Sequence, residues 1–271
     1  MKRDLYFSKP LMNAAGSLGF APDSRAGIAL DSFGAFVTNP LSLRPRVPAA
    51  KPAMIEYQGG FLLHTGLPNP GFHSGLKKYS AKWSRSDLPI IVHLMADRPE
   101  ETQTMVHSLE TQENVMAVEL GVAPLLANDI ILLTLEMCLG ELPLIFSLPI
   151  EQVLSLGPGL IQDGAQAISV SMPRGALPLT PIPSPRFDYA NAPLTAKGKG
   201  ELITGRLYGP SLFPRTLETV YSAARLGLPI IGAGGVWTKE NVEAMLAAGA
   251  LAVQVDAALW GFNWQGQSPI E

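Results

Sequence analysis

At 271 residues the chain is long enough for one barrel-sized domain with a full core, and one domain over residues 1–271 is expected. Its net charge of −3, with 16% charged residues, gives no basic footprint for nucleic acid, and no apolar stretch resembles a leader or a membrane span. One cysteine, Cys138, excludes an intrachain disulfide and a cysteine-based zinc cage, so the composition predicts a soluble cytoplasmic protein.

Buried-type strands alternate with amphipathic helices along the chain, which predicts a parallel α/β sheet. The expected strands cover residues 11–15, 35–38, 90–95, 115–120, 144–148, 167–171, 229–232 and 251–255. The expected helices cover residues 23–31, 71–82, 99–112, 128–139, 150–162, 214–226 and 239–248. Eight strands with intervening helices indicate a (β/α)8 TIM barrel, with no second domain and no internal repeat.

Two connections, residues 40–61 and 172–206, are too long for simple loops and are expected to shape the carboxyl-terminal mouth of the barrel. Their cationic side chains could ring that mouth, although solvated loop charges are the commoner explanation. The residues concerned are Arg44, Arg46, Lys51, Arg174 and Arg186.

The last two strands and the helix between them, residues 229–255, have the pattern of a phosphate-holding corner. Gly234 and Gly235 would let the backbone approach an anion closely. Asp256, however, stands where the phosphate would lie, and two unit charges about 4 Å apart repel by roughly 4 kcal/mol at an effective dielectric of about 20. We expect Asp256 to cap the following helical turn with its own carboxylate, rather than to face solvent.

Five ordered segments resemble the dihydroorotate dehydrogenase family, flavin-dependent TIM barrels of pyrimidine synthesis. They are residues 11–19 (LMNAAGSLG), 34–38 (GAFVT), 65–71 (TGLPNPG), 205–211 (GRLYGPS) and 230–255. The resemblance covers nearly the whole chain and implies FMN as cofactor. The implied cofactor contacts fall on Ala15, Gly16, Ser147, Gly209, Gly234, Gly235, Asp256 and Ala257. The implied substrate contacts fall on His64, Asn69 and Ser171.

The chain differs from the family at positions where the family has its catalytic and ligand-binding residues. Asn39 and His64 stand where the family has a lysine and a substrate-binding asparagine. The family's Glu-Leu-Asn-x-Ser-Cys-Pro-Asn is replaced by residues 119–126 (ELGVAPLL), so the catalytic base falls on Pro124 or Ala123. Neither side chain can accept a proton.

The family's residues are also changed at four further points near the ends of later strands. Ser147 replaces a lysine beside the flavin ring, and Ser171 with the next residue replaces Asn-Thr. Tyr208 replaces the serine of Leu-Ser-Gly, and Asp256 with Ala257 replaces the Gly-Thr or Gly-Ser pair that completes the phosphate cup.

Three functions remain open on this reading. The first is a family relative without oxidoreductase activity, kept as a binding or scaffolding barrel whose small-molecule or protein partner is unknown and which could be a homodimer. The second is an active FMN-dependent oxidoreductase, acting on dihydroorotate or a related small molecule, with His64 as acid or base. The third is an isomerase-like or lyase-like barrel using His64 and Glu119. A metal site from His64, His93 and Glu119 lacks any short ligand-spacing motif, and none is expected.

Overall fold

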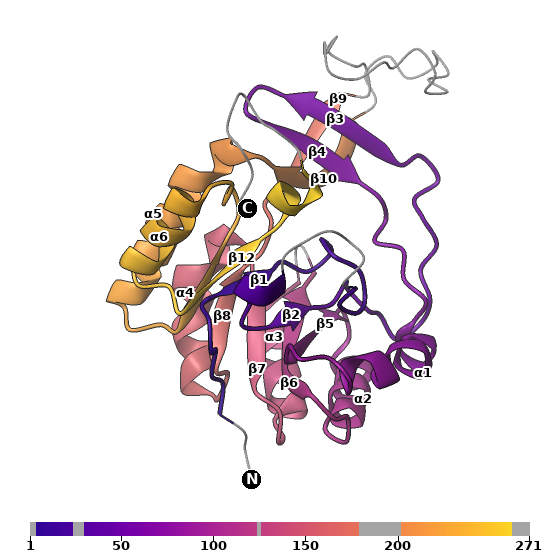
Figure 1. The fold of residues 1–271 in the computed structure, drawn as a ribbon. Coiled ribbons are helices and arrows are strands. Elements are labelled where there is room, and N and C mark those ends of the chain that lie inside the picture. Colours follow the sequence, from indigo (N-terminus) through magenta and orange to yellow (C-terminus); the bar gives the residue numbers. More distant parts are fainter. Residues whose placement is uncertain (1–3, 24–29, 124–125, 179–201, 262–271) are drawn as a thin grey trace.

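The computed structural model describes residues 4–23, 30–123, 126–178 and 202–261. Eight parallel strands stand in the order β1-β12-β11-β8-β7-β6-β5-β2, and a bridge between Met12 and Ala35 joins the first strand to the last (Figure 1). The strands are β1 (Leu11–Asn13), β2 (Phe36–Val37), β5 (Ile90–Ala96), β6 (Val115–Val122), β7 (Leu144–Leu148), β8 (Ala167–Val170), β11 (Ile230–Ala233) and β12 (Ala252–Val255). The predicted (β/α)8 barrel and its eight strands are confirmed.

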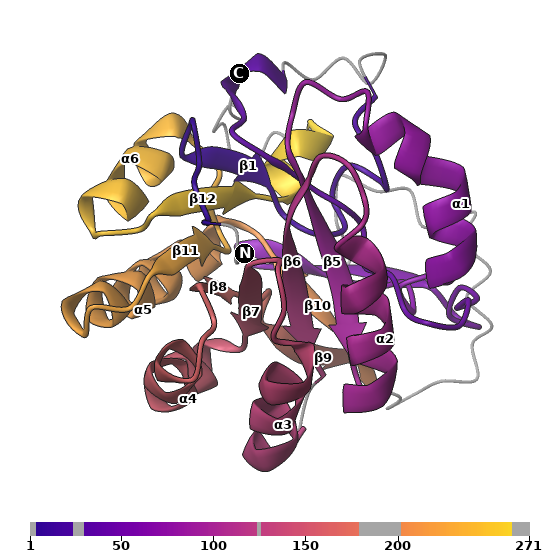
Figure 2. The same ribbon diagram turned by 90° about the horizontal axis from the view of Figure 1, so that it is seen from below.

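Helices surround this ring, as the view along the barrel shows (Figure 2). They are α1 (Phe72–Trp83), α2 (Pro99–Leu109), α3 (Asn128–Cys138), α4 (Ile150–Gln162), α5 (Phe213–Arg225) and α6 (Lys239–Ala247). Pro99 opens α2, and Thr238 forms a capping box with Asn241 at the start of α6. The helix expected at residues 23–31 lies mostly outside the described residues, and its last described part is the 3-10 helix Leu30–Ser32.

Alternation along the strands divides the barrel core into two parts. Residues pointing outward, such as Val92, Leu120 and Phe146, join the large cluster that also contains the helix faces. Residues pointing inward, such as Ile91, Ala117 and Ile145, form a separate apolar cluster inside the ring. Further along the strands the inward positions are polar, and those on β5, β6, β8 and β12 form the buried network described below.

A second sheet lies over the carboxyl ends of the barrel strands (Figure 1). It is antiparallel, in the order β3-β4-β10-β9, with bounds β3 (Ala53–Tyr57), β4 (Gly60–His64), β9 (Arg174–Pro178) and β10 (Leu202–Tyr208). The two long connections expected at the mouth, residues 40–61 and 172–206, therefore contain strands that were not predicted: β3 and β9 lie within them, and β4 and β10 begin in them. Phe61 and Tyr208 belong to the barrel core, whereas Ile55, Leu62 and Ile203 form a small cluster of their own.

In the described ranges, no helix is both long and apolar enough to cross a bilayer.

Candidate functional site at the barrel mouth

A buried polar network occupies the barrel interior above the apolar layer. Glu119 is 1% exposed, and its Oε2 lies 2.6 Å from Nδ1 of His93. Its Oε1 accepts hydrogen bonds from Ser169 Oγ at 2.6 Å and Gln254 Nε2 at 2.8 Å. Burial alone would raise the pKa of Glu119, but the hydrogen bond and charge of His93, with the bonds from Ser169 and Gln254, hold it below its ordinary value. This network gives His93 and Glu119 structural contacts inside the barrel.

Gly121 explains how His93 fits inside the barrel. A Cβ at this position would lie 2.4 Å from His93 Nε2, so the imidazole fills the space of a side chain at residue 121. The family motif has an asparagine at this point of the strand. Glycine at position 121 therefore leaves room for the His93 ring. The ring occupies the space that the family's asparagine side chain would need.

Gly234 and Gly235 form the turn after β11, both with positive φ, at 95° and 74°. A Cβ on Gly235 would lie 2.3 Å from the backbone nitrogen of Phe213, where α5 begins. Thr216 Oγ1 donates to the carbonyl oxygen of Gly234 at 2.7 Å. The packing of α5 against the turn is enough to require both glycines, whether or not the turn holds an anion.

Asp256 directly follows β12 and is 3% exposed, so it does not face solvent. Its Oδ1 accepts the N–H of Ala257 at 2.5 Å and caps the 3-10 helix η5 (Ala257–Trp260), as expected. Its Oδ2 has no hydrogen-bond partner among the described residues. Burial raises the pKa of Asp256 to about 7 despite the bond from Ala257.

Aromatic side chains fill the mouth beneath the antiparallel sheet. The ring of Tyr208 stacks on that of Phe61, with centroids 5.3 Å apart, and lies 5.5 Å from the ring of Trp260. Trp260 Nε1 donates to the carbonyl oxygen of Ser17 at 2.9 Å, which ties η5 to the turn after β1. Burial also raises the pKa of the Tyr208 phenol, so it is neutral at physiological pH. A serine at position 208 would leave much of this space open.

Arg206 belongs to β10, and its side chain reaches the turn after β1. A Cβ built on Gly16 would lie 3.8 Å from its Nη1, so the guanidinium covers the turn that the family turns toward flavin. Arg206 also lines a cavity of about 170 Å³ together with Arg46, His64 and Arg174. Arg206 is not among the residues predicted from the sequence, although it stands two residues before Tyr208 where the resembled family has glycine.

The remaining predicted residues are spread around the mouth, and the structure gives several of them scaffold contacts. Asn39 Oδ1 accepts from the backbone nitrogen of Gly19 at 3.0 Å. The Asn69 side chain is buried and bonds to Ser42 and to the backbone of Leu67 and Gly71. To bind a substrate as predicted, the Asn69 side chain would have to give up some of these hydrogen bonds.

The other predicted positions have small side chains, or none, and these lack the charged and amide groups with which the family binds its ligands. Ser147 is buried in β7, and Ser171 is half-buried directly after β8. Gly209 has a φ of 131° and packs on the backbone of residues 59 and 60, while Ala15 is half-buried after β1. Ala123 is half-buried, whereas Pro124 lies outside the described residues. No three His, Cys, Asp or Glu side chains group as metal ligands in the described ranges, so His64, His93 and Glu119 do not form one site.

The fold and this mouth define a (β/α)8-barrel protein of the class whose sites lie at the carboxyl ends of the strands. The family model described as dihydroorotate dehydrogenase matches residues 3–124, and one described as nitronate monooxygenase matches residues 206–263. The chain is a divergent member of the dihydroorotate dehydrogenase family.

Curated relatives and a solved structure agree with this assignment. The catalytic subunit of dihydroorotate dehydrogenase B (NAD(+)) from Pelobacter propionicus is 28% identical over 94% of this chain and 84% of its own length. The subunit of the same name from Bacillus caldolyticus is 26% identical over 94% of this chain and 82% of its own. A DHODH of Eimeria tenella in complex with ferulenol matches with a TM-score of 0.66 at 16% identity, over 93% of this chain and 76% of that one. This last likeness concerns the fold alone.

Proposed function

We propose that this chain is a dihydroorotate dehydrogenase-like barrel that does not oxidise dihydroorotate and works as a binding protein. The observation that carries the proposal is Asp256, a buried carboxylate in the phosphate corner. It already takes the N–H of Ala257, and above its raised pKa of about 7 it is a charged carboxylate that would repel a phosphate dianion in this corner. The residues of this corner do not fit FMN.

Two further features of the mouth support the proposal. Ala123, one of the two positions onto which the family base aligns, has no proton-accepting group. The Tyr208 ring and the Arg206 guanidinium take up space on the side of the mouth where the resemblance places the flavin. A change in the catalytic base alone would leave the cofactor site intact. Here the changes affect the position of the base, the contacts to the flavin ring and the phosphate corner.

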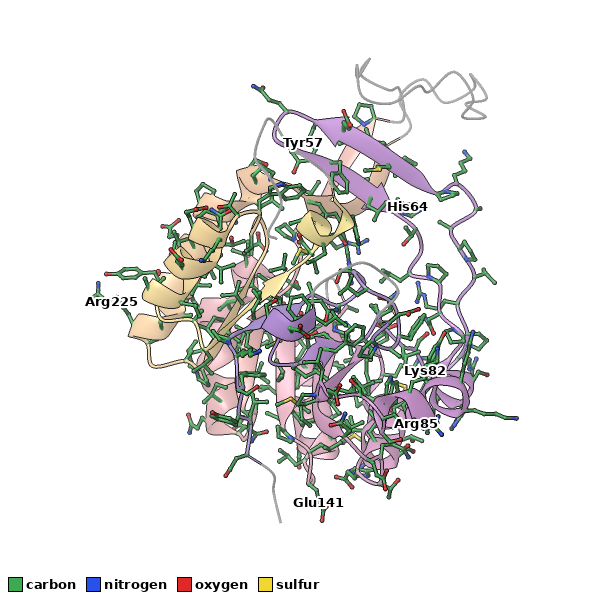
Figure 3. All side chains as sticks on the ribbon, in the orientation of Figure 1. Tyr57, His64, Lys82, Arg85, Glu141 and Arg225 are labelled. Atoms are coloured by element: carbon green, nitrogen blue, oxygen red, sulfur yellow. The ribbon has the colours of Figure 1, made fainter. Side chains whose placement is uncertain are left out.

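The competing proposal is an FMN-dependent oxidoreductase in which His64 is the acid or base. His64 is half-buried at the end of β4 and lines the small cavity, so it is accessible to a ligand (Figure 3). A cytoplasmic location and a possible homodimer belong to either proposal.

Dihydroorotate turnover tests the proposal. The purified protein is mixed with excess FMN, dihydroorotate and an artificial electron acceptor, and orotate formation is followed by its ultraviolet absorbance. We expect no orotate above the protein-free rate. Turnover that requires added FMN and is abolished by His64→Gln would overturn the proposal in favour of the oxidoreductase.

A further inference from the structure

The small cavity at the mouth is surrounded by three arginines that come from three separate segments. Arg46 lies in the connection before β3, Arg174 begins β9, and Arg206 lies in β10. Arg174 and Arg206 are directly opposite each other in the antiparallel register, so their side chains leave the sheet on the same face. That face also carries Phe61 and Tyr208, which pack toward the barrel.

No described residue neutralises this charge at the cavity wall. The wall contains no Asp or Glu in the described ranges, and no described carboxylate forms an ion pair with Arg174 or Arg206. Like charges directly opposite on neighbouring strands are destabilising. The pKa of Arg174 is lowered, first by burial and then by the charge of Arg206, which is consistent with their closeness. An anion bound between the two guanidinium groups would offset this repulsion, for which the described wall residues supply no counter-charge.

The rest of the wall is suited to a small ligand. Arg46 is exposed, and its Nε donates to the carbonyl oxygen of Gly66 at 3.3 Å; both residues line the cavity. Leu67, the next residue, has a φ of 53°, a strained value for a leucine, and such strain is concentrated at ligand-binding segments. The volume of about 170 Å³ fits a compact molecule rather than a nucleotide.

We propose that Arg46, Arg174 and Arg206 form a binding site for a small organic dianion, a dicarboxylate or a phosphate monoester. Planar guanidinium groups bind both kinds of oxyanion through paired hydrogen bonds. His64 and Tyr208 lie at the same wall and add polar contacts. The site rests on the proposed function, because it supplies the ligand of a binding protein that lacks flavin.

Titration calorimetry tests the site, in a buffer without multivalent anions. The probes are succinate, inorganic phosphate, acetate as a monoanion and succinamide as a neutral analogue. We expect succinate or phosphate to bind with a Kd of roughly 1 mM or below, acetate at least about tenfold more weakly, and succinamide not at all. No binding of succinate or phosphate up to about 10 mM would overturn the proposal.

Matched variants separate the site from general surface charge. Arg174→Gln and Arg46→Gln should each weaken dianion binding by roughly 10- to 100-fold. Arg44→Gln removes an exposed arginine two residues before Arg46 and outside the cavity, and should leave the affinity within about twofold. Equal weakening by Arg44→Gln and Arg46→Gln would mean long-range attraction only and would overturn the site.

Stability gives a second, independent readout. Because Arg174 faces Arg206 without a described counter-charge, Arg174→Gln should raise the thermal midpoint of the ligand-free protein while weakening dianion binding. A fall in both the thermal midpoint and the dianion affinity would assign Arg174 a structural role and contradict the proposal.

FMN binding is tested on a parallel sample, to which FMN is added and followed by visible absorbance. Flavin binding there would overturn the proposed function, while the calorimetry still decides the dianion site.

Discussion

Two carboxylates, Glu119 inside the barrel and Asp256 at its phosphate corner, are both almost fully buried. Their pKa values are nevertheless shifted in opposite directions. Three side chains bond to Glu119, and its pKa is lowered. One backbone N–H bonds to Asp256, one of its oxygens has no described partner, and its pKa is raised to about 7. The number of donors, rather than burial, decides the sign. In the barrel interior both oxygens of Glu119 are hydrogen-bonded, so its charged form is stabilised. At the phosphate corner burial disfavours the charged form of Asp256.

Removing the satisfied carboxylate should have the largest effect. Glu119→Ala leaves His93, Ser169 and Gln254 without their common acceptor, and should lower the free energy of unfolding by roughly 3–5 kcal/mol at pH 7. Because the folded pKa of Glu119 is lowered, its contribution is present above the ordinary value of 4.5 and is lost as pH falls below it. Urea denaturation at several pH values measures both effects. A loss below about 1 kcal/mol at pH 7 would contradict the network.

Asp256→Asn should act in the opposite direction. The folded pKa of about 7 lies above the ordinary 3.8, so Asp256 costs stability as pH rises through this window. At about 1.4 kcal/mol per unit, the upper bound is on the order of 4 kcal/mol at pH 8. Asp256→Asn should therefore be more stable than the natural chain at pH 8, with a difference that shrinks toward pH 4. Thermal unfolding at both pH values measures it, and a less stable variant at pH 8 would show that the carboxylate is needed as an anion.

Gly121→Ala should have a smaller effect, since its Cβ meets the His93 ring at 2.4 Å and the ring can shift. We expect a loss of about 1–3 kcal/mol from overpacking. Gly159→Ala is the control, because nothing lies within 4 Å of its Cβ and it sits inside α4. That change should be neutral or stabilising by up to about 1 kcal/mol. Equal losses in the two variants would mean that His93 does not occupy the space beside Gly121.

The barrel could be predicted from the sequence because each of its strands is a buried apolar run between helices with clear ends. The antiparallel sheet could not, since β4 pairs with β10, more than a hundred residues later, and such a partner leaves no local pattern. Gly59, with a φ of 91°, lies in the two-residue turn between β3 and β4 and is the local feature that favours this hairpin.

The candidate site was predictable in part. The position of Asp256 followed from the glycine turn and the last strand, and its capping role from the helical turn behind it. The grouping of Arg46 with Arg174 and Arg206 depends on the antiparallel sheet, so the sequence could list mouth arginines but not bring them together. Arg44, from the same expected ring, lies outside the cavity, and Arg186 lies outside the described residues.

Titration of the purified chain with FMN, followed by visible absorbance at pH 8, tests the central claim most directly. At this pH the Asp256 carboxylate is mostly charged, and the account predicts a colourless protein with no spectral change up to about 100 µM FMN. A yellow protein, or a shifted flavin spectrum with micromolar affinity, would contradict it and return the chain to the oxidoreductases of its family.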